Sequence, residues 1–332
     1  MIRADDVEPM SPTARRRDPA FEAAQQHAPE ADTAAPTIAW RKLTRTRYAD
    51  GLALRDAVAR RAPVIFKDLA ADWPALERWT PEQLSRRFGD KIVSVYDASF
   101  GAPGRNYMGS IDRMPFERFL EETQHRGRDL RMFLYNLSRQ IPELVDDIHL
   151  PDAGPRFSRR FVFSFFGCQG STTPLHYDID MGDVLHTVIR GRRRIRLFAP
   201  PESSALYRHP FTVRSYVNLD APDFERYPAL ARARGYEIVL QAGETLYMPS
   251  GWWHEFHYLD AGMGVSLRAP SPRRRERLQG LGNLLLASPV DRLANRCAPE
   301  RWYRWKTRRA ARNGDALLAS ADRNAAQTGP TR

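Results

Sequence analysis

Short runs of aromatic and β-branched residues, separated by turn residues, dominate the chain from about residue 130 to residue 267. They predict strands at 132–135, 161–166, 184–189, 194–198, 236–240, 244–248, 253–258 and 263–267. Glycine, proline and aspartate lie between most of these runs, as expected for turns. Many short strands at close spacing favour an antiparallel barrel or sandwich, and the mouth of a small barrel can hold one ligand.

Helical patterns lie on both sides of this strand-rich region. The apolar run 61–66 predicts a buried strand, and the segment after Trp79 predicts a helix with Thr80 as N-cap, Pro81 at the first position and Gly89 at the stop. A second short helix is expected at 116–123. Leucines beyond residue 270 fit one or two amphipathic helices, and 302–312 fits a basic one.

Composition changes along the chain indicate four parts. Residues 1–37 are rich in Ala, Pro, Asp, Glu and Gln without an apolar period, which predicts a disordered leader. Residues 38–270 would form the folded domain, 271–315 a basic helical extension, and 316–332 a disordered tail. The sequence therefore predicts a mainly β domain with α/β elements before it and helices after it.

The chain is long and apolar enough for a sizeable core, with 332 residues of which 42% are hydrophobic. No run approaches the roughly 18 consecutive apolar residues of a membrane span, and charges stand where a signal peptide is apolar, so we expect a cytoplasmic protein. Cys168 and Cys297 are the only cysteines, too few for a disulfide framework or a zinc site. A metal ion would have to be held by histidine and carboxylate.

Positive charge is concentrated at the C-terminal end. Residues 271–332 contain 14 Lys or Arg against 5 Asp or Glu, which is +9 of the total +11. With Trp302, Tyr303 and Trp305 interleaved, this segment could contact nucleic acid or an anionic surface. A solvated helical face explains the same charges more simply, so nucleic-acid binding is not the favoured hypothesis.

His176 and Asp178, with His254 far along the chain, form the candidate metal site. Residues i and i+2 of a strand project to the same face, so His176 and Asp178 would point together. On the strand at 253–258, His254 shares a face with Phe256 and Tyr258, whereas His257 lies on the other face. Two imidazoles and one carboxylate on one side of a metal are typical of non-haem Fe(II) oxygenases.

Three ordered segments resemble the core of the cupin-like JmjC family of Fe(II)- and 2-oxoglutarate-dependent oxygenases. They are 173–178 (TPLHYD), 191–201 (GRRRIRLFAPP) and 243–254 (GETLYMPSGWWH), and 62–80 is similar to the family's entry module. The likeness runs from about residue 40 to 270. The asparaginyl hydroxylase that inhibits hypoxia-inducible factor belongs to the same group. It implies a double-stranded β-helix, the jelly-roll or cupin barrel, with N-terminal α/β elements and C-terminal helices.

The resemblance also implies roles for single residues. His176, Asp178 and His254 would bind the iron, and Thr173 would contact 2-oxoglutarate. Arg193 stands where the family places the lysine that binds the far carboxylate of 2-oxoglutarate; a guanidinium can grip a carboxylate through two hydrogen bonds. Arg268 is an alternative anchor.

Further positions remain open under the same resemblance. The family places a tyrosine in the wall of the cosubstrate pocket, and either Tyr135 or Phe133 would take that position. Asp180, Asp183 and His186 are candidates for the polar residue that follows the carboxylate ligand.

These implications together predict a dioxygenase that hydroxylates a protein side chain or a small molecule with O2 and releases succinate and CO2. Its cofactors would be Fe(II) and 2-oxoglutarate, and the C-terminal helices could form a homodimer, as they do in relatives. The alternatives are a non-catalytic cupin that binds a metal or small ligand, and a nucleic-acid-binding protein that uses the basic C-terminal segment.

Overall fold

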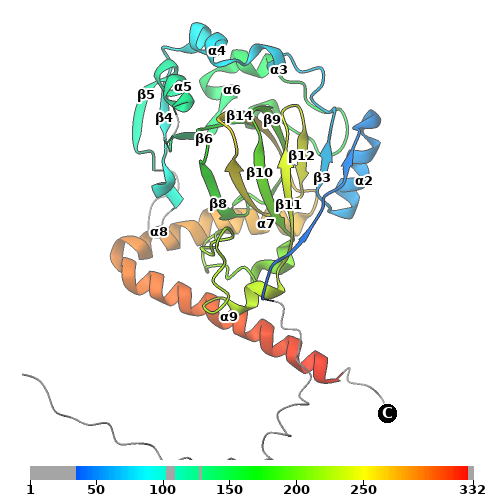
Figure 1. The fold of residues 1–332 in the computed structure, drawn as a ribbon, viewed down its shortest axis with the longest axis vertical. Coiled ribbons are helices and arrows are strands. Elements are labelled where there is room, and N and C mark those ends of the chain that lie inside the picture. The colour runs from blue at the N-terminus through cyan, green and yellow to red at the C-terminus, as the bar shows by residue number, and fades with distance from the viewer. Residues whose placement is uncertain (1–34, 102–108, 126, 128, 328–332) are drawn as a thin grey trace, which may run out of the picture. The chain divides into compact units, whose positions relative to one another are not determined.

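The computed structural model describes residues 35–101, 109–125, 127 and 129–327. The described residues from Thr37 onward form one compact unit. The predicted leader lies almost wholly outside the described residues. Figure 1 shows strands at the centre of this unit, with α4 and α5 toward one end and α8 and α9 toward the other.

Two sheets face each other and make a jelly-roll, so the mainly β fold is confirmed. The five-stranded sheet has the order β1-β11-β10-β13-β8, with bounds Ala39–Arg41, Arg234–Leu240, Arg193–Phe198, Trp253–Tyr258 and Thr172–His176. The seven-stranded sheet has the order β2-β3-β12-β9-β14-β7-β6, with bounds Arg45–Thr46, Val64–Phe66, Thr245–Met248, Gly182–Arg190, Gly262–Pro270, Val162–Gly167 and Arg131–Asn136. A separate hairpin joins β4 (Ile92–Val95) and β5 (Asp112–Pro115).

Helices precede and follow the barrel. The N-terminal ones are α2 (Leu52–Arg60), α3 (Ala75–Arg78), α4 (Pro81–Phe88), α5 (Phe116–Gln124) and α6 (Leu137–Gln140). The C-terminal ones are α7 (Arg274–Gly282), the π-helical segment Asn283–Ala287, α8 (Ser288–Cys297) and α9 (Pro299–Gln327). Short 3-10 turns lie at Ala49–Gly51, Ala98–Gly101, Pro142–Asp147, Arg159–Phe161, Pro200–Ser203 and Pro228–Arg232.

The predicted cap of α4 is present. The Oγ1 atom of Thr80 accepts a hydrogen bond from the backbone N–H of Gln83 at 3.2 Å, and Pro81 occupies the first helical position. Such a cap stabilises a helix by about 1 kcal/mol relative to alanine. Local sequence therefore determines where this helix begins.

The C-terminal helix is longer than the sequence predicts. It continues to Gln327, although a disordered tail is expected from residue 316, so that boundary is corrected. Leu317 and Leu318 explain the difference, because both pack against the buried cluster that contains Tyr207 and Leu230. Tertiary contacts of this kind stabilise a helix that the local sequence alone would not predict.

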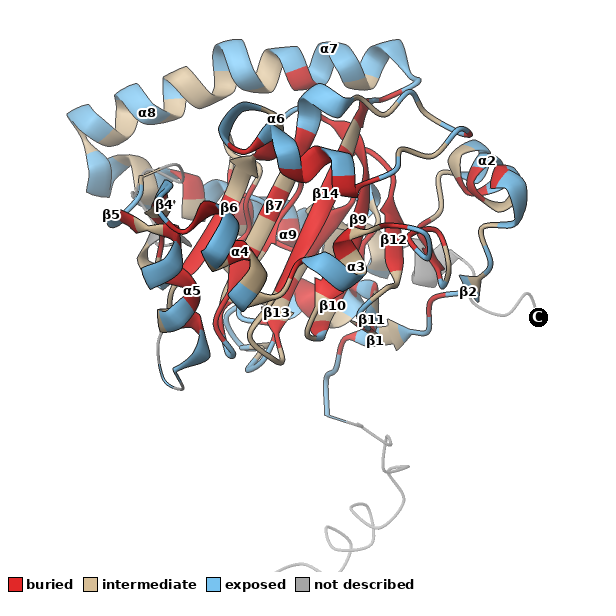
Figure 2. Cartoon of the chain, turned by 90° about the horizontal axis from the view of Figure 1, so that it is seen from above, coloured by how far each residue is buried: buried red, intermediate tan, exposed pale blue. Residues whose placement is uncertain are grey.

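Burial separates the barrel from its C-terminal helices. The inner positions of both sheets are buried and mostly apolar, whereas α7 and α8 are largely exposed (Figure 2). None of the helices in the described parts of the chain combines the length and the apolar character needed to cross a membrane.

Candidate metal and cosubstrate site

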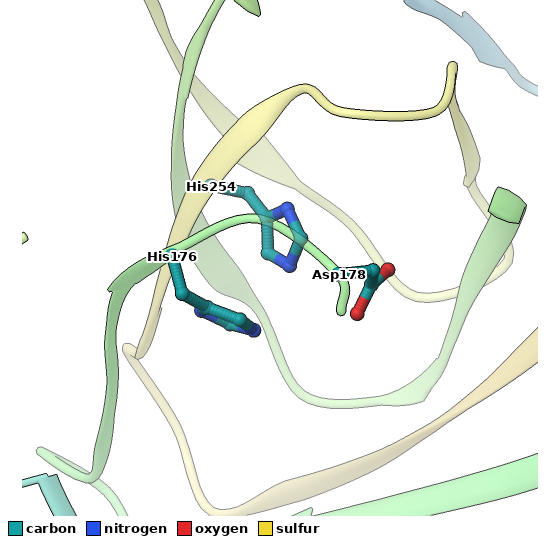
Figure 3. A group of neighbouring side chains, drawn as sticks. All are labelled: His176, Asp178 and His254. Atoms are coloured by element: carbon teal, nitrogen blue, oxygen red, sulfur yellow. The ribbon is translucent and has the colours of Figure 1, made fainter. Parts of the chain in front are cut away.

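Pairing between β8 and β13 brings two histidines together. His176 and His254 are direct partners across the two antiparallel strands, and their ring centroids lie 4.3 Å apart. Asp178 completes the group, and one ligand atom from each of the three residues lies within 4.8 Å of the others (Figure 3). The structure thus assembles the three side chains that the sequence proposes as metal ligands.

Asp178 reaches this group from a loop. Strand β8 ends at His176, so alternation within the strand does not by itself place the carboxylate. The chain stays beside the 209–216 loop because the N–H of Tyr177 donates to the carbonyl oxygen of Val213 at 3.0 Å. Asp178 therefore still faces the two histidines.

Both imidazoles are oriented by backbone carbonyl groups. Nδ1 of His176 lies 2.8 Å from the carbonyl oxygen of Pro174, and Nδ1 of His254 lies 3.0 Å from that of Trp252. Because a carbonyl oxygen only accepts, each Nδ1 carries the proton and each Nε2 is the nitrogen whose lone pair can bind a metal. Burial, together with His254, lowers the pKa of His176 to about 3, and burial also lowers the pKa of His254. Neutral imidazoles of this kind are metal ligands.

Arg268 holds the carboxylate of Asp178. Its guanidinium donates to Oδ1 of Asp178 at 2.7 Å and to both oxygens of Asp180, at 3.0 and 3.2 Å. Burial alone would raise the pKa of Asp178, but the charge of Arg268 and the two histidines outweigh it and lower that pKa to about 2. Asp178 is therefore ionised, and its second oxygen remains available to a cation.

A cavity of about 840 Å³ contains this group and extends past it. His254, Phe256 and Tyr258 line the cavity, whereas His257 does not, as strand alternation predicts. Thr173 from β8 lines it too.

The tyrosine predicted for the pocket wall lies elsewhere. Phe133 and Leu134 line the cavity, but Tyr135 packs against the core of the seven-stranded sheet. A β-bulge between Met132 and Tyr135, with Leu134 at φ +50°, changes the direction of the side chains along β6. Of the two candidates, Phe133 is the one at the cavity.

Arg193 is a buried cation without a carboxylate partner in the described structure. Only 1% of it is exposed, and it lies 4.3 Å from the ring centre of Tyr258. Its guanidinium donates to Nε2 of His186 at 2.7 Å and to the carbonyl oxygen of Phe165 at 3.0 Å, while its Nε has no partner. Burial lowers the pKa of Arg193, as expected for a positive charge that no acid compensates.

The arginines beside Arg193 are all paired. Arg192 binds Asp260 at 2.7 Å, Arg194 binds Asp220 at 2.6 Å, and Arg196 binds Glu237 at 2.6 Å. Alternation along β10 turns Arg193 inward and its neighbours outward. Arg193 is therefore a buried guanidinium without a carboxylate partner among the described residues, at the position where the sequence suggests a carboxylate anchor.

Two other polar candidates have clear places. His186 accepts from Arg193 through Nε2, so its Nδ1 carries the proton and donates to Oγ of Ser266 at 2.8 Å. Asp183 lies away from the cavity, where it accepts from the N–H of Ser250 at 2.8 Å and from the hydroxyl of Tyr247 at 3.0 Å. Asp183 thus fixes the turn before β13.

Sequence reasoning missed the part of the cavity wall that comes from beyond β14. Arg214 from the 209–216 loop, Asp291 and Asn295 from α8, and Lys306 from α9 all line the same cavity. No local sequence pattern marks these residues, because they come from a loop and two helices that meet at the cavity only in the folded protein.

Comparison with known proteins agrees with this architecture. The profile of the cupin-like domain family matches residues 51–268. The chain is 30% identical to tRNA wybutosine-synthesizing protein 5 of Gallus gallus over 249 residues, which cover 68% of this chain and 73% of that protein. It is 28% identical to lysine-specific demethylase 8 of Xenopus tropicalis over 213 residues, covering 61% of this chain and 47% of that one.

A further relative carries the family's name. Jumonji C domain-containing protein 5 of Drosophila melanogaster is 28% identical over 204 residues, covering 58% of this chain and 50% of that protein. The alignments thus cover about half the length of this relative and of the Xenopus demethylase. The chain belongs to the cupin-like JmjC family, a family of oxygenases, and it contains a candidate metal site.

Proposed function

We propose that this protein is an Fe(II)- and 2-oxoglutarate-dependent dioxygenase that hydroxylates a protein side chain or a small molecule. One observation carries the proposal: two neutral imidazoles and an ionised carboxylate meet within 4.8 Å in a cavity that also contains the uncompensated charge of Arg193. The ligand set suits Fe(II), and the buried cation suits a dicarboxylate.

His176, Asp178 and His254 would hold the iron. Their donor atoms already face one another, and carbonyl groups and Arg268 fix each ligand from behind. Bound iron with 2-oxoglutarate and O2 supplies the oxidation of a C–H bond to an alcohol, with release of succinate and CO2. The protein's own part is to orient the ligands and to surround the reacting bond with apolar side chains.

Arg193 and Thr173 would bind 2-oxoglutarate. Arg193 is held in place by His186 and the carbonyl of Phe165, so its remaining N–H groups are already positioned for a carboxylate. Arg268 is a weaker candidate, because Asp178 and Asp180 already occupy its guanidinium. We therefore assign Arg268 to positioning Asp178 and Arg193 to the far carboxylate.

Turnover of 2-oxoglutarate without added substrate tests this function. The full-length chain with Fe(II) and O2 should release succinate, and His176→Ala and Asp178→Ala should each lower the rate by at least about 100-fold because the metal site loses a ligand. His257→Ala is the matched control, since this histidine lies on the same strand but not at the cavity.

Succinate release would be measured beside bound iron and the thermal unfolding midpoint of each variant. Normal turnover in both ligand variants would refute the proposal. Iron binding by the wild type without any consumption of 2-oxoglutarate would instead support a non-catalytic cupin.

Three other sequence expectations remain proposals. Leu278, Leu281, Leu285 and Leu293 are exposed on the C-terminal helices, which favours a homodimer through these helices. Nucleic-acid binding by the basic segment would appear as a steep loss of affinity with salt. The cytoplasmic location expected from the sequence stays a prediction.

A further inference from the structure

The cavity at the candidate iron site continues to the C-terminal helices. Besides the triad it is lined by Arg214 from the loop after β10, by residues of α8 and by Lys306 of α9. We call this part the outer compartment and define it by its polar residues, which are Arg214, Asp291, Arg292, Asn295, Arg296 and Lys306. A substrate that reaches the iron site from this side must pass these side chains.

Asp291 joins the two helices that build the compartment. Its Oδ1 accepts from Nε1 of Trp302 at 2.7 Å and from Nζ of Lys306 at 2.6 Å, and its Oδ2 accepts from Nδ2 of Asn295 at 3.0 Å. Lys306 is buried, so its ammonium and the carboxylate of Asp291 neutralise each other. Asp291 therefore contributes no net negative charge to the compartment.

The other charges of the compartment are positive. Arg292 and Arg296 are one turn apart on α8, and neither forms an ion pair within the described residues. Arg214 is the β-bridge partner of His176, and its charge helps to lower the pKa of that histidine. The outer compartment is thus electropositive from its α8 side to the first proposed iron ligand.

Apolar side chains fill the wall between these charges. Phe163, Phe211, Val213 and Leu284 line the cavity beside the polar residues. Pockets that bind small ligands combine such apolar walls with a few polar groups that set orientation.

We propose that the outer compartment is the substrate site and selects a group that carries a carboxylate or phosphate on an apolar stem. This inference rests on the proposed function, because it assumes that the substrate reacts at the proposed iron site. Arg292 and Arg296 bind the anion, and the apolar wall holds the stem, so that the carbon to be hydroxylated lies toward His176 and Asp178. The basic C-terminal segment is then a specificity element of the active site.

Asn295 adds a second polar contact. Its Nδ2 must face Asp291, since a carboxylate can only accept, and its Oδ1 is buried without a partner among the described residues. A buried acceptor without a donor costs about 1–3 kcal/mol, which a donor on the bound substrate would recover. The selected group therefore carries an N–H or O–H near its anion.

Matched probes test the charge preference. Phenylbutyrate, phenylpropyl phosphate and the neutral methyl ester of phenylbutyrate share an apolar stem and differ in the terminal group. Calorimetric titration would use the full-length chain with Fe(II) and 2-oxoglutarate under anaerobic conditions, so that Arg193 is already occupied. We expect at least one of the two anions to bind about tenfold more tightly than the ester, and the tighter anion tells carboxylate from phosphate.

Variants show where the preference arises. The double variant Arg292→Gln, Arg296→Gln should bind anion and ester equally, whereas Arg308→Gln, Arg309→Gln should keep the preference, because these exposed arginines of α9 do not line the cavity. Equal affinity of the wild type for all three probes, absence of binding, or a preference that survives in the α8 variant would overturn the proposal. Uncoupled succinate release by the wild type, measured in parallel, shows separately whether the proposed oxygenase function holds.

Discussion

Arg193 illustrates how a single buried charge can indicate a ligand. Desolvating a guanidinium is costly unless an anion or several acceptors compensate it, and in the described structure Arg193 has only a histidine nitrogen, a carbonyl oxygen and the ring of Tyr258. Its neighbours on β10 have carboxylate partners and need no ligand. A bound carboxylate would supply the missing compensation.

Replacing Arg193 tests that compensation. Arg193→Lys keeps the charge but loses the two-pronged geometry, so we expect the KM for 2-oxoglutarate to rise about tenfold. Arg193→Met removes the charge and should raise the KM for 2-oxoglutarate further. It should also destabilise the fold, because Nε2 of His186 loses its donor. The dependence of succinate release on 2-oxoglutarate concentration measures both. Arg194→Lys is the control, and an unchanged KM in Arg193→Met would show that the anchor lies elsewhere.

At the scale of single residues, the sequence predicts the metal ligands but not the ion pairs between side chains that are far apart along the chain. It proposed His176, Asp178 and His254 together, and alternation along β13 chose His254 over His257. Only the resemblance to the family singles out Arg193 among the neighbouring arginines, because the partners of the others, Asp220, Glu237 and Asp260, reach them only through the fold.

At the scale of elements, the periodicity of the sequence predicts the strands but not the irregularities within them. The predicted strand 236–240 corresponds to β11 (Arg234–Leu240), and 253–258 coincides with β13. The bulge in β6 has no sequence signal of its own, and it moved Tyr135 away from the cavity. Helix α9 outlasts its predicted end because Leu317 and Leu318 find tertiary partners.

Gly280 determines how closely α7 packs on the loop that follows Asp178. A Cβ atom at this position would lie 2.3 Å from the carbonyl oxygen of Asp180, whereas one at Gly282 of the same helix would meet nothing within 4 Å. Gly280→Ala must therefore move α7 or the loop, and we expect it to destabilise the fold by about 1–3 kcal/mol. Gly282→Ala should be neutral or stabilise by up to about 1 kcal/mol, through helix propensity.

Denaturant unfolding of the two glycine variants measures this difference. Because Asp180 also binds Arg268, which holds Asp178, the Gly280 variant should bind iron less tightly as well. Equal stability and equal iron affinity of the two alanine variants would contradict the packing argument.

At the scale of the whole molecule, the barrel and the C-terminal helices are less separate than their compositions suggest. Charge and leucine content mark residues 271–315 as an extension, yet Asp291, Asn295 and Lys306 from this segment line the cavity of the barrel. The composition of a segment indicates how much of it is exposed to solvent. It does not indicate which cavity the folded segment lines. The C-terminal helices α7 and α8 are largely exposed in Figure 2, and leucines of this part of the chain are among the exposed residues.

These leucines lead to a prediction about assembly. Leu278 and Leu285 are two turns apart and are 68% and 64% exposed. Full burial of a leucine side chain stabilises by about 1.5–3 kcal/mol, so a second copy that covers this face would gain substantially. We expect the full-length chain to have twice its monomer mass of 38.1 kDa in light scattering after size-exclusion chromatography.

Charge substitution on this face should separate the copies. Leu278→Glu with Leu285→Glu should yield a monomer because the carboxylates would be desolvated in the interface. Leu52→Glu is the matched control, since Leu52 is 65% exposed but lies on α2. A wild-type monomer, or a dimer that survives the double substitution, would show that another contact or none joins the copies. Because the helix that carries Leu278 and Leu285 continues without a break into α8, which carries the arginines of the outer compartment, dissociation should also alter the binding of phenylbutyrate.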